Sequence, residues 1–177
     1  MLVGIAVLVL VVAVALLVVG TRTGAPSVGT ASFTDPTNHF SATYHDTPTQ
    51  QDQNTPLGNR TLHEVLWSDS IDSNQAEIVG YADFPADFTI ADPHNALDGS
   101  VNGEVTNTHG SLVTKTFGTY QGYGSVDALI SESGGYVQTR AVIAGRTLYI
   151  VVVTSQDNPP PLFSSFANSL RILNHAS

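Results

Sequence analysis

The sequence predicts an α+β domain in which a twisted antiparallel sheet of about six or seven strands lies between helices. Segments with alternating apolar and polar residues, rich in β-branched side chains, recur along the chain, as strands require. Two segments with helical spacing interrupt and end this series. Two consecutive strands near the C-terminus are apolar on both faces, so both faces of the sheet need cover.

The strands are predicted from alternation and from β-branched content. A polar segment, residues 48–60, is expected to be a loop between the first two strands. The predicted strands cover residues 39–45, 60–68, 76–84, 111–118, 125–133, 136–143 and 146–154.

The last two strands are predicted to form a hairpin that turns at Ala144 and Gly145. If Ile143 lies opposite Arg146, Arg140 faces Tyr149 across the pair. The first face then carries Val137, Ala141, Ile143, Leu148, Ile150 and Val152, and the second Val142, Tyr149, Val151 and Val153. Two apolar faces indicate a central pair of strands.

Two helices are predicted to cover the sheet. Residues 91–107 offer Asp92 as N-cap and Pro93 at the first helical position, followed by Leu97, Val101 and Val105 on one face. Residues 159–173 begin with prolines and carry a stripe of apolar residues, Leu162, Phe163, Phe166, Leu170 and Leu173.

The composition excludes several classes of function. Hydrophobic residues make up 42% of the 177 residues, enough for a core and too many for general disorder. The net charge is −9, from fifteen acidic and six basic residues without a basic cluster, which argues against nucleic acid as a partner. The absence of cysteine excludes disulfides, thiolate zinc sites and cysteine nucleophiles.

An apolar run without charge or proline opens the chain, from Leu2 to Gly20. Its nineteen residues would span about 28 Å as a helix, close to the thickness of a bilayer core. No Lys or Arg precedes it, unlike a cleavable signal. We therefore expect residues 1–20 to be a retained transmembrane anchor. The alternative is a cleaved export signal, with a tolerable cleavage site after Gly20.

The remainder is predicted to form one domain, residues 33–177, joined to the anchor by a flexible tether, residues 21–32. Low charge and abundant Ser and Thr favour an extracytoplasmic location, although Arg22 on the C-terminal flank of the run favours the opposite orientation. The predicted protein is therefore single-pass, with its domain outside the cytoplasm.

Several short patterns resemble the PsbP-like family. They are "FSATYHDTP", "YADFP" before the first helix, "GYG" before the fifth strand, "RTLYIVVV" and the closing "FANSLRIL", spread over residues 33–173. The family includes an extrinsic photosystem protein, a Ran-binding protein and many bacterial envelope proteins, and this chain looks most similar to the last group. The resemblance implies an α/β/α sandwich. It transfers no catalytic residues, because none are known for the group as a whole.

Two features are candidate contacts for a ligand or a partner. Arg140 on a largely apolar face needs partners, so it predicts either a structural pair with Tyr149 or a carboxylate, or a pocket for an anionic ligand. The glycine-rich link "FGTYQGYG" presents Phe117, Tyr120 and Tyr123, which could anchor a partner from a mobile loop or simply flank a tight turn.

Six histidines raise the alternative of an enzyme. His39 and His45 share a strand face beside Asp46, and His63 could approach from a neighbouring strand, although His39 and His45 lie about 20 Å apart on a straight strand. Asp83 and Asp87 flank Pro85 as a potential acid and base. No nucleophile elbow, phosphate loop or H-E-x-x-H motif occurs, and no cofactor or metal site is predicted.

The sequence thus predicts a membrane-anchored, non-enzymatic, extracytoplasmic domain that binds a protein partner or a small ligand. The alternatives are a metal-dependent or hydrolytic enzyme of the cell envelope and an adaptor tethered to the inner face of the membrane.

Overall fold

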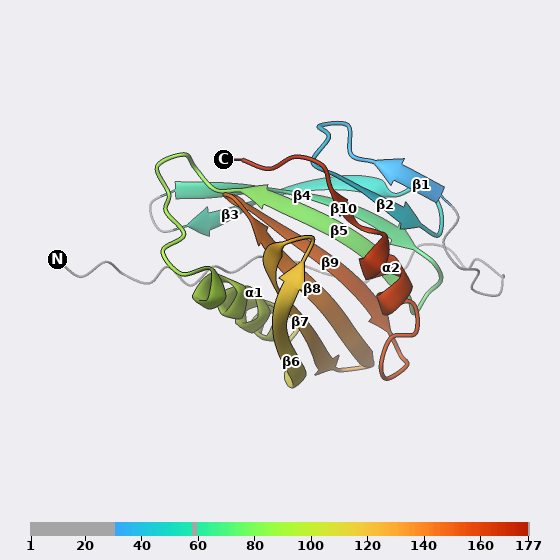
Figure 1. Cartoon of the computed structure of the whole chain (residues 1–177). Helices are drawn as coiled ribbons and strands as arrows, with labels where there is room; N and C mark the ends of the chain where they lie inside the picture. The colour runs from blue at the N-terminus through green and yellow to red at the C-terminus, as the bar shows by residue number, and fades with distance from the viewer. Residues whose placement is uncertain (1–30, 58–59, 177) are drawn as a thin grey trace.

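The computed structural model describes residues 31–57 and 60–176, which form two antiparallel sheets and two helices (Figure 1). The elements are β1 (Ala31–Thr34), β2 (Phe40–Tyr44), β3 (Thr49–Leu57), β4 (Arg60–Ser70), β5 (Ala76–Asp83), α1 (Pro93–Asn107), β6 (Ser111–Tyr120), β7 (Tyr123–Glu132), β8 (Gly135–Ala144), β9 (Thr147–Ser155), α2 (Phe163–Ser169) and β10 (Arg171–Ile172).

The larger sheet has seven strands in the order β3-β4-β5-β9-β8-β7-β6. β9 occupies its centre and is buried along its whole length, which explains its uninterrupted apolar sequence. β3 and β6 are the two edges. The β5–β9 pairing joins strands that are far apart in the sequence, with Ala76 opposite Thr154 at one end.

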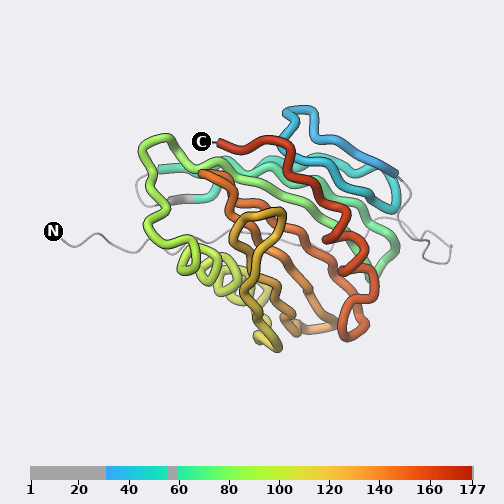
Figure 2. Tube along the Cα trace, in the orientation of Figure 1, coloured from blue at the N-terminus to red at the C-terminus, as the bar shows by residue number. Residues whose placement is uncertain are grey.

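The second sheet is small and joins the two ends of the described chain. β2 pairs with β1 on one side and with β10 on the other. The tube in Figure 2 shows the C-terminal segment returning beside the first strands of the domain. Phe40 and Tyr44 of β2 are fully buried, so this sheet is a structural layer of the core.

Each face of the larger sheet carries its own apolar core. On the α1 face, Leu97 and Val101 pack against alternate residues of the sheet. On the opposite α2 face, helix α2 and the small sheet together cover a second cluster, which is rich in aromatic residues. The second cluster includes Phe40, Tyr44, Trp67, Tyr81, Tyr149, Phe163 and Phe166.

The prediction of an α+β fold built on a large antiparallel sheet is confirmed, and so is Asp92 as N-cap of α1. Its carboxylate accepts hydrogen bonds from the backbone N–H groups of His94 (2.9 Å) and Asn95 (3.3 Å). The two predicted faces of the β8–β9 pair are also confirmed, since their members separate into the two clusters as expected.

The register predicted for the β8–β9 hairpin is wrong by two residues. The turn consists of Gly145 and Arg146, so Ile143 lies opposite Leu148 and Arg140 opposite Val151. Gly145 adopts φ +58°, which glycine tolerates, and it takes the first position of this two-residue turn, whereas the prediction placed it second, after Ala144. Tyr149 therefore faces Val142.

Three other boundaries are corrected. The predicted loop at residues 48–60 contains β3, which pairs with β4. Because β3 is an edge strand, its polar side chains can face solvent. β1 begins at Ala31, so residues 31 and 32 belong to the domain and not to the tether. The second helix ends at Ser169 because the chain extends at Leu170 to form β10, which leaves Leu173 46% exposed.

The predicted anchor, residues 1–20, lies outside the described residues. Within the described part of the chain, no helix has both the length and the apolar character needed to cross a bilayer.

Candidate functional site

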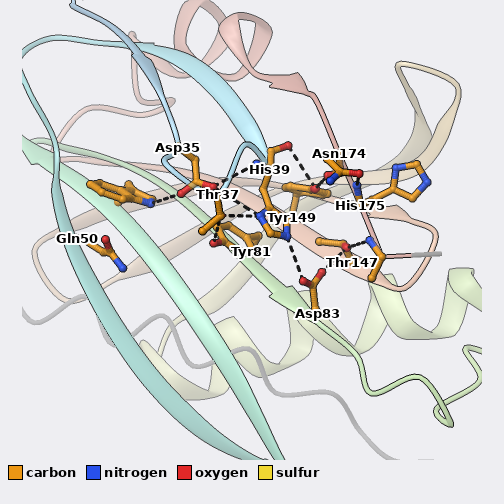
Figure 3. A network of polar contacts seen from close by, with 12 residues as sticks. Asp35, Thr37, His39, Gln50, Tyr81, Asp83, Thr147, Tyr149, Asn174 and His175 are labelled. Carbon is orange, nitrogen blue, oxygen red and sulfur yellow. Dashed lines mark hydrogen bonds and ion pairs between the residues drawn. The ribbon is translucent and has the colours of Figure 1, made fainter.

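A polar network forms where the small sheet meets the ends of β5 and β9 (Figure 3). Its centre is His39, in the turn between β1 and β2. The imidazole ring stacks on the Tyr81 ring at 4.0 Å between centroids. Its Nε2 lies 3.1 Å from Asp83 Oδ2, and its Nδ1 lies 2.7 Å from Thr37 Oγ1. We call this set the His39 network.

Asp35 fixes the turn that carries His39. Its buried carboxylate accepts hydrogen bonds from the Trp67 indole N–H (3.1 Å), from the His39 backbone N–H (3.2 Å) and from the Thr37 hydroxyl. The indole and the turn are thereby attached to one side chain, so the position of the turn depends on a charged group inside the α2-face core.

The C-terminal segment closes the other side of the network. The Tyr149 hydroxyl donates to the carbonyl oxygens of His39 (3.4 Å) and Asn174. The Thr147 hydroxyl donates to Asp83 and accepts from the backbone N–H of Ala176 at 2.9 Å. Burial raises the pKa of Tyr149, so its hydroxyl keeps the proton that it donates.

The arrangement Thr37–His39–Asp83 places a hydroxyl, an imidazole and a carboxylate in sequence. The single Thr37 proton, however, is donated to the Asp35 carboxylate, so the hydroxyl can only accept from His39 Nδ1. His39 Nε2 lies 3.1 Å from Asp83 Oδ2. Because its proton is directed at Asp35, the Thr37 hydroxyl is not presented to His39 as a nucleophile that the imidazole could deprotonate. The network is therefore built to join three chain segments.

The hairpin β6–β7 carries the three predicted aromatic contacts. Of the two alternatives for this link, the structure shows the tight turn, because residues 111–120 and 123–132 are continuous strands joined at Gln121 and Gly122. Phe117 stacks on the His94 ring at 3.8 Å between centroids. The Tyr120 hydroxyl contacts the carbonyl oxygens at the end of α2, and the Tyr123 ring meets His175 edge-on.

Arg140 contacts a carboxylate and an aromatic ring, which agrees with the structural pair, one of its two predicted roles. Tyr149, however, is not its partner. Its Nε and Nη2 donate to the two oxygens of Asp127 at 2.7 and 2.8 Å. Its Nη1 donates to Asn168, and the Tyr120 ring lies 4.7 Å from the guanidinium. With all three nitrogens donating within the domain, the guanidinium is not presented to an anionic ligand.

The outer edge of the hairpin is the most exposed apolar part of the described chain. Leu112 and Val113 at the start of β6 are 40% and 48% exposed. A bulge between Leu112 and Thr114 interrupts the pairing with β7 at this point. We call Ser111–Tyr120 with its free edge the β6 edge. The sequence did not single it out, because its alternation resembles that of any paired strand.

The histidines and carboxylates of the enzyme alternative do not gather into one site, although His39 and Asp83 contact each other. His39 and His45 flank β2 at its two ends, and His63 lies on β4 opposite Asn54. Asp87 pairs with Arg60, while Asp83 belongs to the His39 network. Among residues 31–57 and 60–176, no group of three such side chains could hold a metal ion.

Two buried carboxyls near His45 also have structural contacts. Asp69 and Glu77 lie opposite each other on β4 and β5, 6% and 2% exposed. They accept hydrogen bonds from the backbone N–H groups of Asp46 (2.6 Å) and His45 (2.9 Å) respectively. Burial and the charge of Asp69 raise the pKa of Glu77 to about 7.

Comparison with known proteins supports the fold directly. No family model and no curated protein matches the sequence. The solution structure of cyanobacterial PsbP (CyanoP) from Synechocystis sp. PCC 6803 is similar, with a TM-score of 0.58 at 14% identity. The match covers 86% of this chain and 98% of that one. This chain therefore has a PsbP-like fold.

Proposed function

We propose that this chain is a non-enzymatic domain, held at a membrane by its N-terminal apolar run on the extracytoplasmic side, that binds a protein partner through the β6 edge. The observation that carries the proposal is the exposure of Leu112 and Val113 on an edge strand. An edge strand offers unpaired backbone N–H and C=O groups, and exposed apolar side chains beside them favour an added strand from a partner.

The two edges of the sheet differ in a way that supports this choice. β3, at the far edge, is rich in Gln, Asp and Asn, which discourage apolar association. In β6, the Lys115 side chain points toward α1 and pairs with Asp98, and a bulge lies at Val113. Lys115 and the bulge both limit continuous pairing of β6 with the β6 strand of a second copy. The first residues of the strand stay open to a short partner segment.

The aromatic residues of the hairpin support the edge from behind. Phe117 rests on His94 on the α1 face, and Tyr120 is tied to the end of α2 on the other face. Because the hairpin is anchored on both sides of the sheet, the β6 edge is a preorganised surface, which lowers the entropic cost of binding.

Site-specific photo-crosslinking in the cells that make the protein tests the surface. A photoreactive residue at Val113 should give a discrete adduct with a partner, and the same residue at Gln51 on β3 should not. Val113→Asp should remove the partner from co-purification, while Gln51→Asp, which adds the same charge to the opposite edge, should leave it. Equal adducts at both edges, or none at either, would contradict the proposal.

Membrane attachment is tested separately. The full-length chain should stay in the membrane pellet after alkaline carbonate extraction, and its domain should be cleaved by protease added outside intact cells. A soluble mature chain that begins just after Gly20 would mean a cleaved signal. Protection from external protease would place the domain on the inner face.

A further inference from the structure

Helix α1 covers one face of the sheet with few apolar contacts. Its fifteen residues include Gly99 and Gly103, and no basic residue lies in its last turn to balance the helix dipole. Its buried apolar side chains are Leu97 and Val101, with Ala96 and Val105 partly buried against the same core. The remaining buried side chain of any size on this helix is a carboxyl group, that of Glu104. The attachment of α1 to the sheet therefore includes a buried carboxyl group beside its apolar contacts.

Glu104 lies between α1 and β8 in polar surroundings that are not fully hydrogen bonded. Its side chain is 5% exposed, and Thr139 of β8, beneath it, is 1% exposed. Within the described residues, Glu104 Oε1 and Asn107 Nδ2 are buried without a hydrogen-bond partner. Asn107 lies three residues beyond Glu104, on the same side of the helix.

The charged neighbours do not compensate the Glu104 carboxylate. Glu132, at the end of β7, opposes its ionisation, and Lys115, on β6, is paired with Asp98 of α1. β8 contributes the neutral hydroxyl of Thr139, which favours the ionised form, and α1 itself contributes Asn107. Burial nevertheless dominates and raises the pKa of Glu104 to about 7.

We propose that Glu104 is a pH-sensitive clasp: in its protonated form α1 docks on the sheet, and its ionisation releases α1 and uncovers the apolar α1 face. The docked helix binds the proton more tightly than the released helix. Docking is therefore favoured at low pH and weakens as the pH rises through the range in which only the docked form holds the proton. This inference goes beyond the proposed function, although α1 also supplies His94 and Asp98, which contact Phe117 and Lys115 of the β6 edge.

Hydrogen exchange of α1 in the full-length chain, held in detergent micelles, tests the proposal. A pKa that falls from about 7 in the docked helix to 4.5 in the released one predicts about 30-fold loss of protection in residues 96–107 between pH 5.5 and 8.5. Protection factors, corrected for the intrinsic pH dependence of exchange, are the readout. Unchanged protection over this range would overturn the proposal.

Variants separate the clasp from general loosening. Glu104→Gln should keep α1 protected at both pH values, and Glu77→Gln, a buried carboxyl of the other face, should leave the pH response of α1 intact. Thr139→Val removes the hydroxyl that favours the ionised form, so it should enlarge the loss at pH 8.5 and leave pH 5.5 unchanged. If Glu104→Gln does not fold, Thr139→Val alone tests the proposal. A persistent pH response in Glu104→Gln, or an unaltered profile in Thr139→Val, would contradict the proposal.

Discussion

At the scale of single residues, this domain places carboxyl groups inside its core and uses them in two ways. Asp35 and Asp69 accept hydrogen bonds from groups that fix the chain around the small sheet. Glu77 does the same, but it lies directly opposite Asp69, so two buried acids share one site. Such a pair makes stability depend on pH.

Glu77→Gln should raise the free energy of unfolding at pH 8.5 by about 2 kcal/mol and have little effect near pH 4.5. The pKa of Glu77 is raised from 4.5 to about 7 in the folded state, so the native protein binds more protons than the unfolded chain in that interval. Stability therefore falls as the pH rises through it, and glutamine removes that loss. Urea unfolding at the two pH values measures the effect.

The control is Asp157→Asn, which neutralises an exposed carboxylate and should change stability equally little at both pH values. An equal gain for Glu77→Gln at pH 4.5 and pH 8.5 would show that ionisation of Glu77 is not the cause.

The pair Arg140–Asp127 makes a different prediction at this scale. Asp127→Ala should lower the free energy of unfolding by about 1–2 kcal/mol, because it strands a half-buried guanidinium. Adding Arg140→Met should restore part of the loss, since the ring of Tyr120 can pack on a methionine. A double-mutant cycle by urea unfolding measures the coupling. Losses that simply add would contradict the pairing.

At the scale of elements, the turn between β8 and β9 links the larger sheet to the C-terminal segment. The backbone N–H of Arg146 donates to the Ala176 carbonyl oxygen at 2.7 Å. A Cβ at Gly145 would meet that same carbonyl oxygen and would lie 2.6 Å from His175 Cδ2. Glycine is therefore needed there both for its positive φ and for the close approach of another segment.

Gly145→Ala should cost about 2–3 kcal/mol of stability, and Gly122→Ala about 1 kcal/mol. Both glycines have positive φ, at +58° and +86°, but a Cβ at Gly122 would meet nothing within 4 Å. The difference between the two variants, measured by urea unfolding, isolates the contact with the C-terminal segment. Equal losses would show that backbone strain alone accounts for both.

The elements that the sequence predicts are those whose pattern is local. The faces of β8 and β9 were correct although the register was not, because a shift of two residues keeps every side chain on its face. β3 was missed because an edge strand can be polar, and β1 and β10 because they are short and are defined by pairing with β2. The pairing that defines these three strands cannot be read from the sequence of each segment alone.

The candidate site was harder to predict for the same reason. The His39 network joins residues from the β1–β2 turn, β5, β9 and the C-terminal segment, and the β5–β9 pairing that brings Tyr81 opposite Tyr149 is non-local. Arg140 was singled out because a charge on an apolar face is a local anomaly. Its partner Asp127 was not identified, because that required the β7–β8 register.

At the scale of the whole molecule, the fold is closed by its own ends. β10 pairs with β2, and Leu173 N–H donates to the His39 carbonyl oxygen at 2.9 Å. Tyr149 and Arg146 bind the carbonyl oxygens of Asn174 and Ala176. The last residues of the domain therefore hold its first strands in place over the α2-face core.

A chain that ends at Leu170 should lose about 3 kcal/mol of stability, because several partly buried hydrogen bonds are removed together. Thermal unfolding followed by the fluorescence of Trp67, the single tryptophan, measures the loss. Leu173→Ser is the control: it alters a 46% exposed side chain, keeps the backbone pairing and should melt like the unmodified protein. A truncated chain with an unchanged melting temperature would refute a closing role for the C-terminus.

The position of β10 in the chain also has a consequence for biosynthesis. Its partner β2 is made among the first described residues of the domain, and β10 is made after every other described strand. During translation the aromatic layer over the sheet has no complete cover, and the nascent chain presents it to whatever factors attend synthesis or export. Closure of this domain therefore follows the synthesis of all its other described strands.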